Sequence, residues 1–124
     1  RMPNINAALG CAQLENLDKY VASKRKVAAE YIEHFKNVDG IDFFVEPENT
    51  FSNYWLSAVV LKDKESQLDF LQQTNDNGVM TRPIWELMNH LPMFENCEND
   101  GLKNTIWFAN RVVNIPSSIR LEDL

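Results

Sequence analysis

The chain has 124 residues, of which 44% are hydrophobic and 24% are charged, a balance that fits one globular domain with a packed core. Its formal net charge is −6, and its one concentrated basic run covers residues 24–26, which argues against a nucleic-acid or anionic-membrane surface. No apolar run of about eighteen residues and no signal-peptide pattern occur, so we expect a cytoplasmic protein without a membrane span.

The two cysteines, Cys11 and Cys97, lie far apart in the sequence. They have neither CxxC spacing nor the Cys/His spacing of a zinc site. We therefore expect two ordinary buried or surface thiols, and no metal.

Residues 1–35 are predicted to form one long helix, because apolar side chains recur every three to four residues, with a gap at Lys24. The apolar positions are Ile5, Leu9, Ala12, Leu17, Val21, Ala28, Ile32 and Phe35. Asn4 is the expected N-cap, and Gly40 lies just beyond the other end. Such a helix extends about 45–50 Å, whereas a compact chain of this length has a radius of gyration of about 14 Å. We expect it to overhang its domain.

The two halves of this helix differ in side-chain size. Small residues gather in the first half, namely Ala7, Ala8, Gly10, Cys11 and Ala12. Bulky Tyr31, Ile32 and Phe35 follow in the second half, which we expect to face the core. The first half is then the overhang, built to meet another surface; the alternative is an ordinary long helix with a frayed start. The chain begins at Arg1 without an initiator methionine, so we also expect a fragment whose other domain lies upstream.

Two strands are predicted after the helix. Ile41, Phe43 and Val45 recur at every second position, the period of a half-buried strand over residues 41–45. The aromatic and β-branched run at residues 54–61 predicts a central strand. Because the connection between them is short, we expect the two strands to pair antiparallel.

A second helix is predicted from Lys64 to about Asp76. Asp63 is its expected N-cap, and the Asn77-Gly78 pair is a strong left-handed C-cap. Leu68 and Leu71 are expected to face inward.

The remaining chain alternates short elements with one irregular loop. Residues 79–81 predict a short strand, and residues 82–96 predict a shaped loop, because they contain two prolines and keep no regular period. A helix is expected to begin at Asn99 or Asp100, followed by a strand at residues 112–115.

Ser118 is a candidate cap for a last helix. The order helix, strand, strand, helix, strand, helix, strand predicts an α+β fold. In that fold the long N-terminal helix and the other helices pack on one face of a small, largely antiparallel sheet, all within a single domain.

The irregular loop carries the candidate binding residues. Arg82 supplies a fixed cation, Trp85 a ring on which a ligand can stack, and His90 an imidazole, a combination that suits an anionic or ring-bearing small molecule. The alternative is an ordinary surface loop that Trp85 and Phe94 anchor. In the full-length protein, Arg82 would then pair with a local carboxylate such as Glu86, and Trp85 would plug the domain interface. Because no Gly-rich phosphate loop, GxSxG or HExxH motif occurs, no catalytic residue is assigned.

Four sequence blocks follow one another along nearly the whole chain. They are RMPNINAALGCAQLENLDKY at residues 1–20, SNYWLSAVVL at 52–61, TRPIWELMNHLPMF at 81–94 and NIPSS at 114–118. Together they resemble the C-terminal small domain of DegT-type nucleotide-sugar aminotransferases, which are fold type I enzymes that use pyridoxal 5'-phosphate. The third block is most similar to the branch that aminates 4-keto-6-deoxy sugars on the way to bacillosamine- or legionaminic-type sugars.

The resemblance implies a reaction and an assembly. The parent enzyme would transfer an amino group, commonly from glutamate, to a nucleotide-linked 4-keto-6-deoxy sugar in surface-glycan biosynthesis, as a homodimer with sites at the subunit interface. The Schiff-base lysine and most cofactor contacts belong to a large N-terminal domain that precedes these 124 residues. The domain alone is therefore expected to be inactive and to bind no cofactor.

The resemblance also assigns roles to particular residues. Arg1 matches an arginine that lies near the cofactor phosphate or the substrate of the neighbouring subunit. Arg82 and Trp85 match a loop that borders the sugar-nucleotide site. Many relatives carry a histidine where this chain has Asn89, followed here by His90, so either side chain is a candidate for substrate contact. A protein of another class, a free-standing α+β module for interaction or small-molecule sensing, is the alternative.

Overall fold

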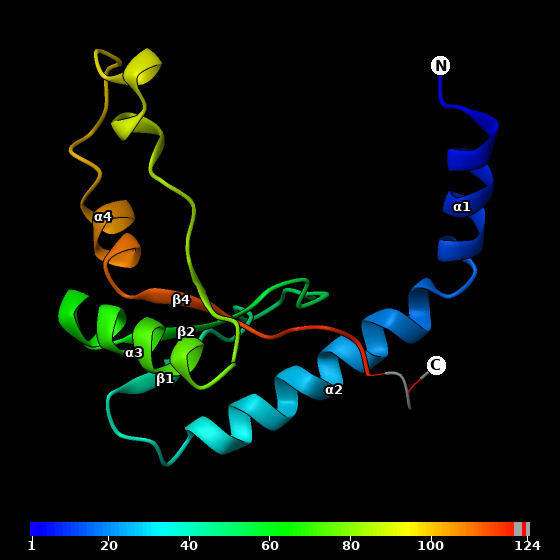
Figure 1. Ribbon diagram of the computed structural model, residues 1–124, viewed down its shortest axis with the longest axis horizontal. Helices are drawn as coiled ribbons and strands as arrows, with labels where there is room; N and C mark the ends of the chain where they lie inside the picture. Colours follow the sequence, from blue (N-terminus) through cyan, green and yellow to red (C-terminus); the bar gives the residue numbers. More distant parts are fainter. Residues whose placement is uncertain (121–122, 124) are drawn as a thin grey trace.

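The computed structural model describes residues 1–120 and 123. The elements are α1 (Asn4–Leu14), α2 (Leu17–Phe35), β1 (Ile41–Phe43), β2 (Ser57–Leu61), α3 (Lys64–Asp76), β3 (Arg82–Pro83), the 3₁₀ turns η1 (Met88–His90) and η2 (Pro92–Phe94), α4 (Lys103–Ala109) and β4 (Val112–Ile115). The chain combines four helices with a small four-stranded antiparallel sheet, which confirms the predicted α+β class (Figure 1).

The last strand in sequence lies inside the sheet, whose order is β1-β2-β4-β3. β1 and β2 pair antiparallel as predicted, and β4 pairs with both β2 and β3. β3 is an edge strand, where Pro83 is tolerated because its missing N–H removes no bond to a further strand. This order brings residues that are about thirty positions apart in sequence to one edge of the sheet.

The core lies between the sheet and the helices α2 and α3. Val59 and Val113 face each other across β2 and β4, and both side chains are fully buried. Phe43 of β1 stacks on Tyr31 of α2. Because neighbouring strand residues point to opposite faces, the following residue, Phe44, meets α4 on the other side through Phe108. The helices therefore cover both faces, rather than the single face that was predicted.

The predicted single helix over residues 1–35 is two helices. They are separated at Glu15 and Asn16, where Asn16 has φ −111° and ψ 4°. Its side-chain Nδ2 donates to the Ala12 carbonyl at 3.1 Å, while its backbone N–H bonds to the Gln13 carbonyl. A side-chain hydrogen bond therefore replaces the backbone hydrogen bond of a continuous helix at the break. The start also differs by one position, because Pro3 is the N-cap and Asn4 is the first helical residue.

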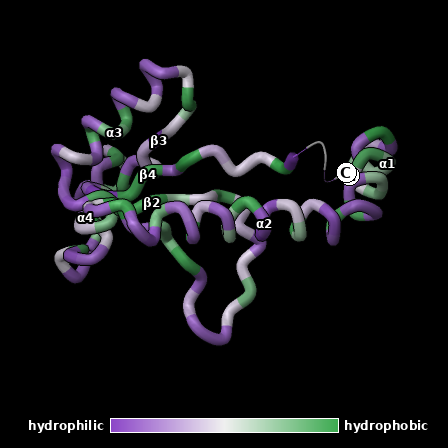
Figure 2. The backbone as a smooth tube through the Cα atoms, turned by 90° about the horizontal axis from the view of Figure 1, so that it is seen from below, coloured by the Kyte–Doolittle hydropathy of each residue, from purple (hydrophilic) through white to green (hydrophobic). Residues whose placement is uncertain are grey.

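The overhang is confirmed, and α1 is the overhanging part. None of its residues is buried, and Ile5 and Leu9 are 82% and 61% exposed. α2 by contrast buries Val27 and Ala28, and Ala28 belongs to the hydrophobic core with residues of the sheet. Figures 1 and 2 show α1 extending beyond the end of α2, away from the sheet.

The first two strands are shorter than predicted. β1 ends at Phe43, and β2 begins at Ser57. In the connection, Asn53 Oδ1 accepts a hydrogen bond from the Trp55 N–H at 2.9 Å, and Tyr54 adopts a positive φ of 46°. A local side-chain bond therefore bends the chain where the aromatic residues favoured a strand.

Both ends of α3 form as predicted. Asp63 accepts a hydrogen bond from the Ser66 N–H at 2.9 Å, which caps the first turn and lowers the pKa of Asp63. Gly78 has φ 78° just beyond the C-terminus. The strand expected at residues 79–81 lies instead at β3, because the Val79 N–H is bonded back to the Thr74 carbonyl at 2.8 Å and closes this turn.

The inward face of α3 was predicted only in part. Leu71 packs against the core, but Leu68 is 55% exposed. The fully buried residue is Gln67, whose Nε2 donates to the carbonyls of Ala109 at 3.0 Å and Val112 at 2.7 Å. A polar side chain occupies this position because it satisfies two carbonyls where α4 leads into β4.

α4 begins at Lys103, later than expected. Asn99 Oδ1 accepts from the Gly101 N–H and Asp100 Oδ1 accepts from the Leu102 N–H, both at 2.9 Å, so these residues form tight turns before the helix. The helix expected after Ser118 falls partly on residues 121, 122 and 124, which lie outside the described residues.

Candidate functional site

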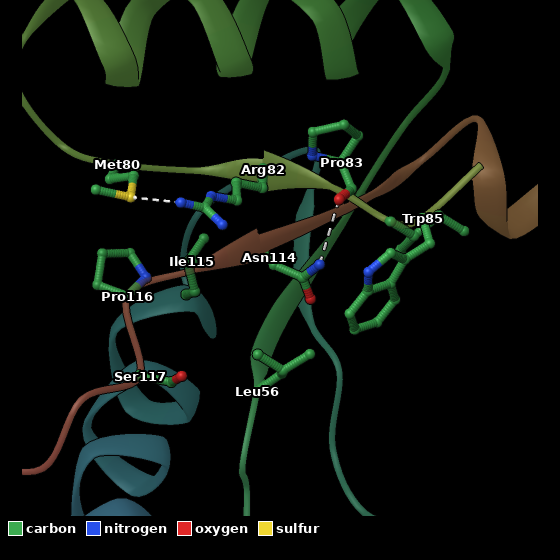
Figure 3. Close-up of a pocket in the computed structure, with 10 residues that line it drawn as sticks. Leu56, Met80, Arg82, Pro83, Trp85, Asn114, Ile115, Pro116 and Ser117 are labelled. Atoms are coloured by element: carbon green, nitrogen blue, oxygen red, sulfur yellow. Dashed lines mark hydrogen bonds between the residues drawn. The ribbon is translucent and has the colours of Figure 1, made fainter.

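A pocket of about 510 Å³ opens where β3 lies beside β4. Its lining comes from residues 82–85, residues 114–117, Leu56 and Met80 (Figure 3). Three of the four sequence blocks that carry the family resemblance thus contribute to one cavity.

Strand pairing explains why these distant residues meet. Arg82 pairs with Asn114 across the β3–β4 ladder, and Asn114 Nδ2 donates to the Pro83 carbonyl at 3.4 Å. On the other side of β4, the ladder with β2 ends at the pair of Ser57 and Ile115. Leu56, one residue before Ser57, therefore lies at the same end of the sheet.

Arg82 is the charged residue of the pocket lining, and it is exposed. Its Nη2 has a sulfur acceptor, Met80 Sδ, at 3.3 Å. Glu86, its expected partner in the alternative interpretation, is bonded to His90 Nδ1 at 2.5 Å instead. Among the described residues no carboxylate forms an ion pair with Arg82, so its guanidinium can receive an anionic or carbonyl oxygen.

Trp85 is 72% exposed, and its indole lies beside the pocket below β3 (Figure 3). An aromatic ring with a free face offers a flat apolar surface on which a ligand ring can pack. Trp85 therefore does not anchor its loop in a core, as the ordinary-loop interpretation requires.

The structure does not bring Asn89 and His90 to this pocket. Both belong to η1, in the segment between β3 and α4 that extends away from the sheet in Figure 1. Asn89 lines a separate cavity of about 390 Å³, and His90 is exposed. Their contact with substrate stays a prediction.

Arg1 is exposed and precedes α1, at the end of the helix that extends away from the sheet (Figure 1). Its contact with the cofactor phosphate also stays a prediction, because a partner surface would have to supply the rest of that site.

Sequence reasoning did not select Leu56, Asn114 or Ser117 as site residues. Residues 112–115 were read only as a strand, although the NIPSS block was the available signal for Asn114 and Ser117. The pairing that places Asn114 beside Arg82 involves a two-residue strand, which is too short to show a period.

The chemistry of the lining is that of a binding surface. It offers one guanidinium, one indole, one amide and one hydroxyl, and it includes neither a lysine nor a carboxylate. The lining of this pocket therefore does not by itself fit pyridoxal phosphate, because it supplies no lysine amine that could hold the cofactor covalently.

Other site types find no support in residues 1–120 and 123. No three His, Cys, Asp or Glu side chains in this range gather as a metal site would require. Within it, no helix has the length and apolarity needed to cross a bilayer. Cys11 and Cys97 are both exposed free thiols.

The sequence pattern of the DegT/DnrJ/EryC1/StrS aminotransferase family matches residues 1–123. GDP-perosamine synthase of Vibrio cholerae is 30% identical over 123 residues, which cover 94% of this chain and 32% of that protein. The chain spans between 24% and 33% of the length of the curated relatives that it matches.

Solved structures show the same fold. Helicobacter pylori PseC, an aminotransferase involved in the biosynthesis of pseudoaminic acid, matches with a TM-score of 0.86 and 16% identity, over 99% of this chain and 34% of that one. DesV of S. venezuelae, in complex with a ketimine intermediate, matches with a TM-score of 0.84 and 21% identity, over 99% and 34% of the two chains.

Proposed function

Because the chain belongs to the DegT/DnrJ/EryC1/StrS aminotransferase family, we propose that it is the C-terminal small domain of a pyridoxal 5'-phosphate-dependent nucleotide-sugar aminotransferase. The reaction is the transfer of an amino group, from glutamate, to a nucleotide-linked 4-keto-6-deoxy sugar. The third sequence block favours the bacillosamine- or legionaminic-type branch of surface-glycan biosynthesis. The name of the V. cholerae relative, a synthase of a GDP-linked amino sugar, supports the general class of substrate.

The proposed full-length enzyme also contains a large domain and a second subunit. A large domain that carries the covalent lysine precedes Arg1, in keeping with the chain spanning about a third of the V. cholerae relative. The assembled enzyme is a cytoplasmic homodimer, with Arg1 near the cofactor phosphate of the neighbouring subunit and with Asn89 and His90 as further substrate contacts.

One observation carries the assignment of the substrate site, namely the convergence of Arg82, Trp85 and Asn114 on one pocket. Arg82 precedes Pro83, whose ring restricts the arginine backbone to extended geometry, and pairing with β4 then holds it at the sheet edge. In this position the guanidinium meets an anionic or carbonyl oxygen of the nucleotide sugar, and the indole packs beside it.

The cofactor, when bound in the parent enzyme, supplies the electron sink for amino transfer. This chain contributes a wall that binds and orients the sugar nucleotide. We expect the chain alone to be inactive, because the covalent lysine and the phosphate cradle belong to the upstream domain. Mixed with pyridoxal phosphate, it should give no saturable one-to-one absorbance band. If such a band formed, and changing one lysine abolished it, the assignment of the covalent lysine to the upstream domain would be wrong.

The test titrates the nucleotide sugar into folded, cofactor-loaded full-length enzyme. A lost charge-assisted hydrogen bond costs about 1.5–3 kcal/mol, so Arg82→Ala should weaken binding by about 10- to 150-fold. Trp85→Ala should weaken it as well, whereas Trp107→Ala, which removes an exposed indole of α4 outside the pocket lining, should not. Cofactor absorbance should be unchanged in all three.

Two results would contradict the proposal. Unchanged affinity in Arg82→Ala and Trp85→Ala, together with lowered melting temperatures, would make both side chains structural. A start codon in place of an upstream lysine-bearing domain would favour the free-standing module for interaction or sensing.

A further inference from the structure

Lys24 interrupts the apolar period of α2, and the structure shows what replaces packing at this position. Its Nζ donates to the Ser117 carbonyl at 2.6 Å and to the Trp55 carbonyl at 3.3 Å. Among the described residues no carboxylate forms an ion pair with it, and burial lowers the pKa of its ammonium group. The ammonium therefore holds two backbone segments rather than a counter-charge.

These two segments need such a connection, because the backbone ladder between them has stopped. β2 and β4 pair as far as Ser57 and Ile115, and Pro116, which follows, has no N–H to continue the pairing. Beyond this point side chains donate the hydrogen bonds that the backbone no longer makes, since Ser117 Oγ also donates to the Trp55 carbonyl, at 3.0 Å. Trp55 and Ser117 thus stay together beyond the end of the sheet.

α2 supports the same segment at two further points. Tyr31 Oη donates to the Pro116 carbonyl at 3.0 Å, and Ser23 Oγ accepts from the Arg120 N–H at 3.2 Å. Side chains of α2 therefore form hydrogen bonds along the chain that follows β4. Of the three side chains, Ser23, Lys24 and Tyr31, Lys24 also bonds to the chain that precedes β2.

The two carbonyls that Lys24 bonds belong to a residue that lines the pocket, Ser117, and to Trp55, the neighbour of another. Leu56 follows Trp55, and both Leu56 and Ser117 line the cavity, across from Arg82 and the start of its loop (Figure 3). Without the bonds from Lys24 to the Trp55 and Ser117 carbonyls, the wall formed by Leu56 and Ser117 could move relative to Arg82.

We propose that Lys24 is a positioning residue for the nucleotide-sugar pocket. By holding the carbonyls of Trp55 and Ser117 together, it sets the spacing between the Leu56 wall and Arg82, and hence the fit of the sugar nucleotide. This inference rests on the proposed function of the pocket.

The test compares three lysine variants of the full-length enzyme. Lys24→Met keeps the apolar stem and removes the donors, and it should raise KM for the nucleotide sugar by about tenfold while kcat stays within about twofold. Lys24→Arg can still donate to both carbonyls and should restore a KM near that of wild type. Lys19→Met is the matched control, because Lys19 is an exposed lysine of the same helix.

Ser117→Ala provides a second test, since it removes one donor from the Trp55 carbonyl and leaves α2 unchanged. Because Ser117 also lines the pocket, the decisive quantity is the coupling of its effect to that of Lys24→Met. The variant should raise KM by about three- to fivefold, and its effect should not add fully to that of Lys24→Met, because both donors share one acceptor. If Lys24→Met does not fold, an unchanged KM in Ser117→Ala overturns the inference.

The two proposals fail in different ways. If the wild-type enzyme binds no nucleotide sugar, the proposed function is wrong, and the role of Lys24 falls with it. If the wild type binds and both Lys24→Met and Ser117→Ala bind equally well, the pocket is confirmed and only the positioning role is wrong.

Discussion

Two kinds of region make up this molecule. The body, residues 17–83 and 103–120, contains the sheet with α2, α3 and α4 and all the buried residues of the described chain. The projections, residues 1–16 and 84–102, extend from it in Figure 1 and contain no buried residue.

The projections are nevertheless rich in apolar side chains. Leu9 and Leu14 on the first are 61% and 68% exposed, and Met88 and Met93 on the second are 60% and 72% exposed. Exposed apolar surface of this kind is typical of an interaction site. The body thus has a buried core within the chain, whereas neither projection has one. We expect the projections to meet a surface outside the chain, and the following changes test that distinction.

The largest difference is expected between the same substitution made in the two regions. Leu61 is 4% exposed in the body, so Leu61→Ala should lower the free energy of unfolding by about 2–5 kcal/mol through lost burial and a cavity. Leu9→Ala on α1 should change it by no more than about 0.5 kcal/mol. Urea unfolding of the monomeric chain measures both, and equal losses would mean that α1 is packed in solution.

A smaller difference is expected for two glutamines of α3. Gln67→Ala leaves the Ala109 and Val112 carbonyls without their side-chain donor and should cost about 2–3 kcal/mol. Gln72→Ala, at an exposed position of the same helix, should be close to neutral. If Gln67→Ala also left the free energy of unfolding in urea unchanged, the hydrogen bonds from Gln67 to the Ala109 and Val112 carbonyls would contribute nothing to stability.

The connection between β1 and β2 should show a pH dependence. Glu46 accepts bonds from the Arg25 guanidinium at 2.7 and 3.0 Å and from the Ser52 N–H at 2.6 Å, which lower its pKa from 4.5 to about 2. Because the pKa is lower in the folded state, ionised Glu46 stabilises the fold fully above about pH 4.5, and this contribution is lost as the pH falls toward 2.

Glu46→Gln should therefore melt at a lower temperature at pH 7 and show a shallower decline between pH 4.5 and pH 2. Glu48→Gln, an exposed carboxylate of the same connection, should follow the wild-type curve. Melting curves across this range decide the question, and identical slopes for wild type and Glu46→Gln would refute the role of this pair.

The smallest free energy is expected for the opening of α1. An eleven-residue helix without buried contacts is marginal in water, so its amides should exchange within about tenfold of the unfolded rate, while those of residues 27–35 are protected by the core. Hydrogen exchange on the dilute monomer measures both segments. Equal protection of residues 5–14 and 27–35 would contradict the division between body and projection.

The sequence by itself determined the local elements of this protein. Apart from the break between α1 and α2 and the position of β3, the order of helices and strands was predictable, as were the Asp63 cap and the turn at Gly78, because each depends on a period or on a side chain close in the sequence. The resemblance pointed to Arg82 and Trp85 for a similar reason, since their block is contiguous.

Only the tertiary structure decided which distant groups meet. Asn114 lies beside Arg82 through a two-residue strand with no period, and Gln67 is buried because two carbonyls from another helix end and strand converge on it. Lys24 disturbed the helical pattern, but its role depends on where the β2–β4 ladder stops. Pairing and burial of this kind are set by contacts across tens of residues, and no local pattern in the chain encodes their partners.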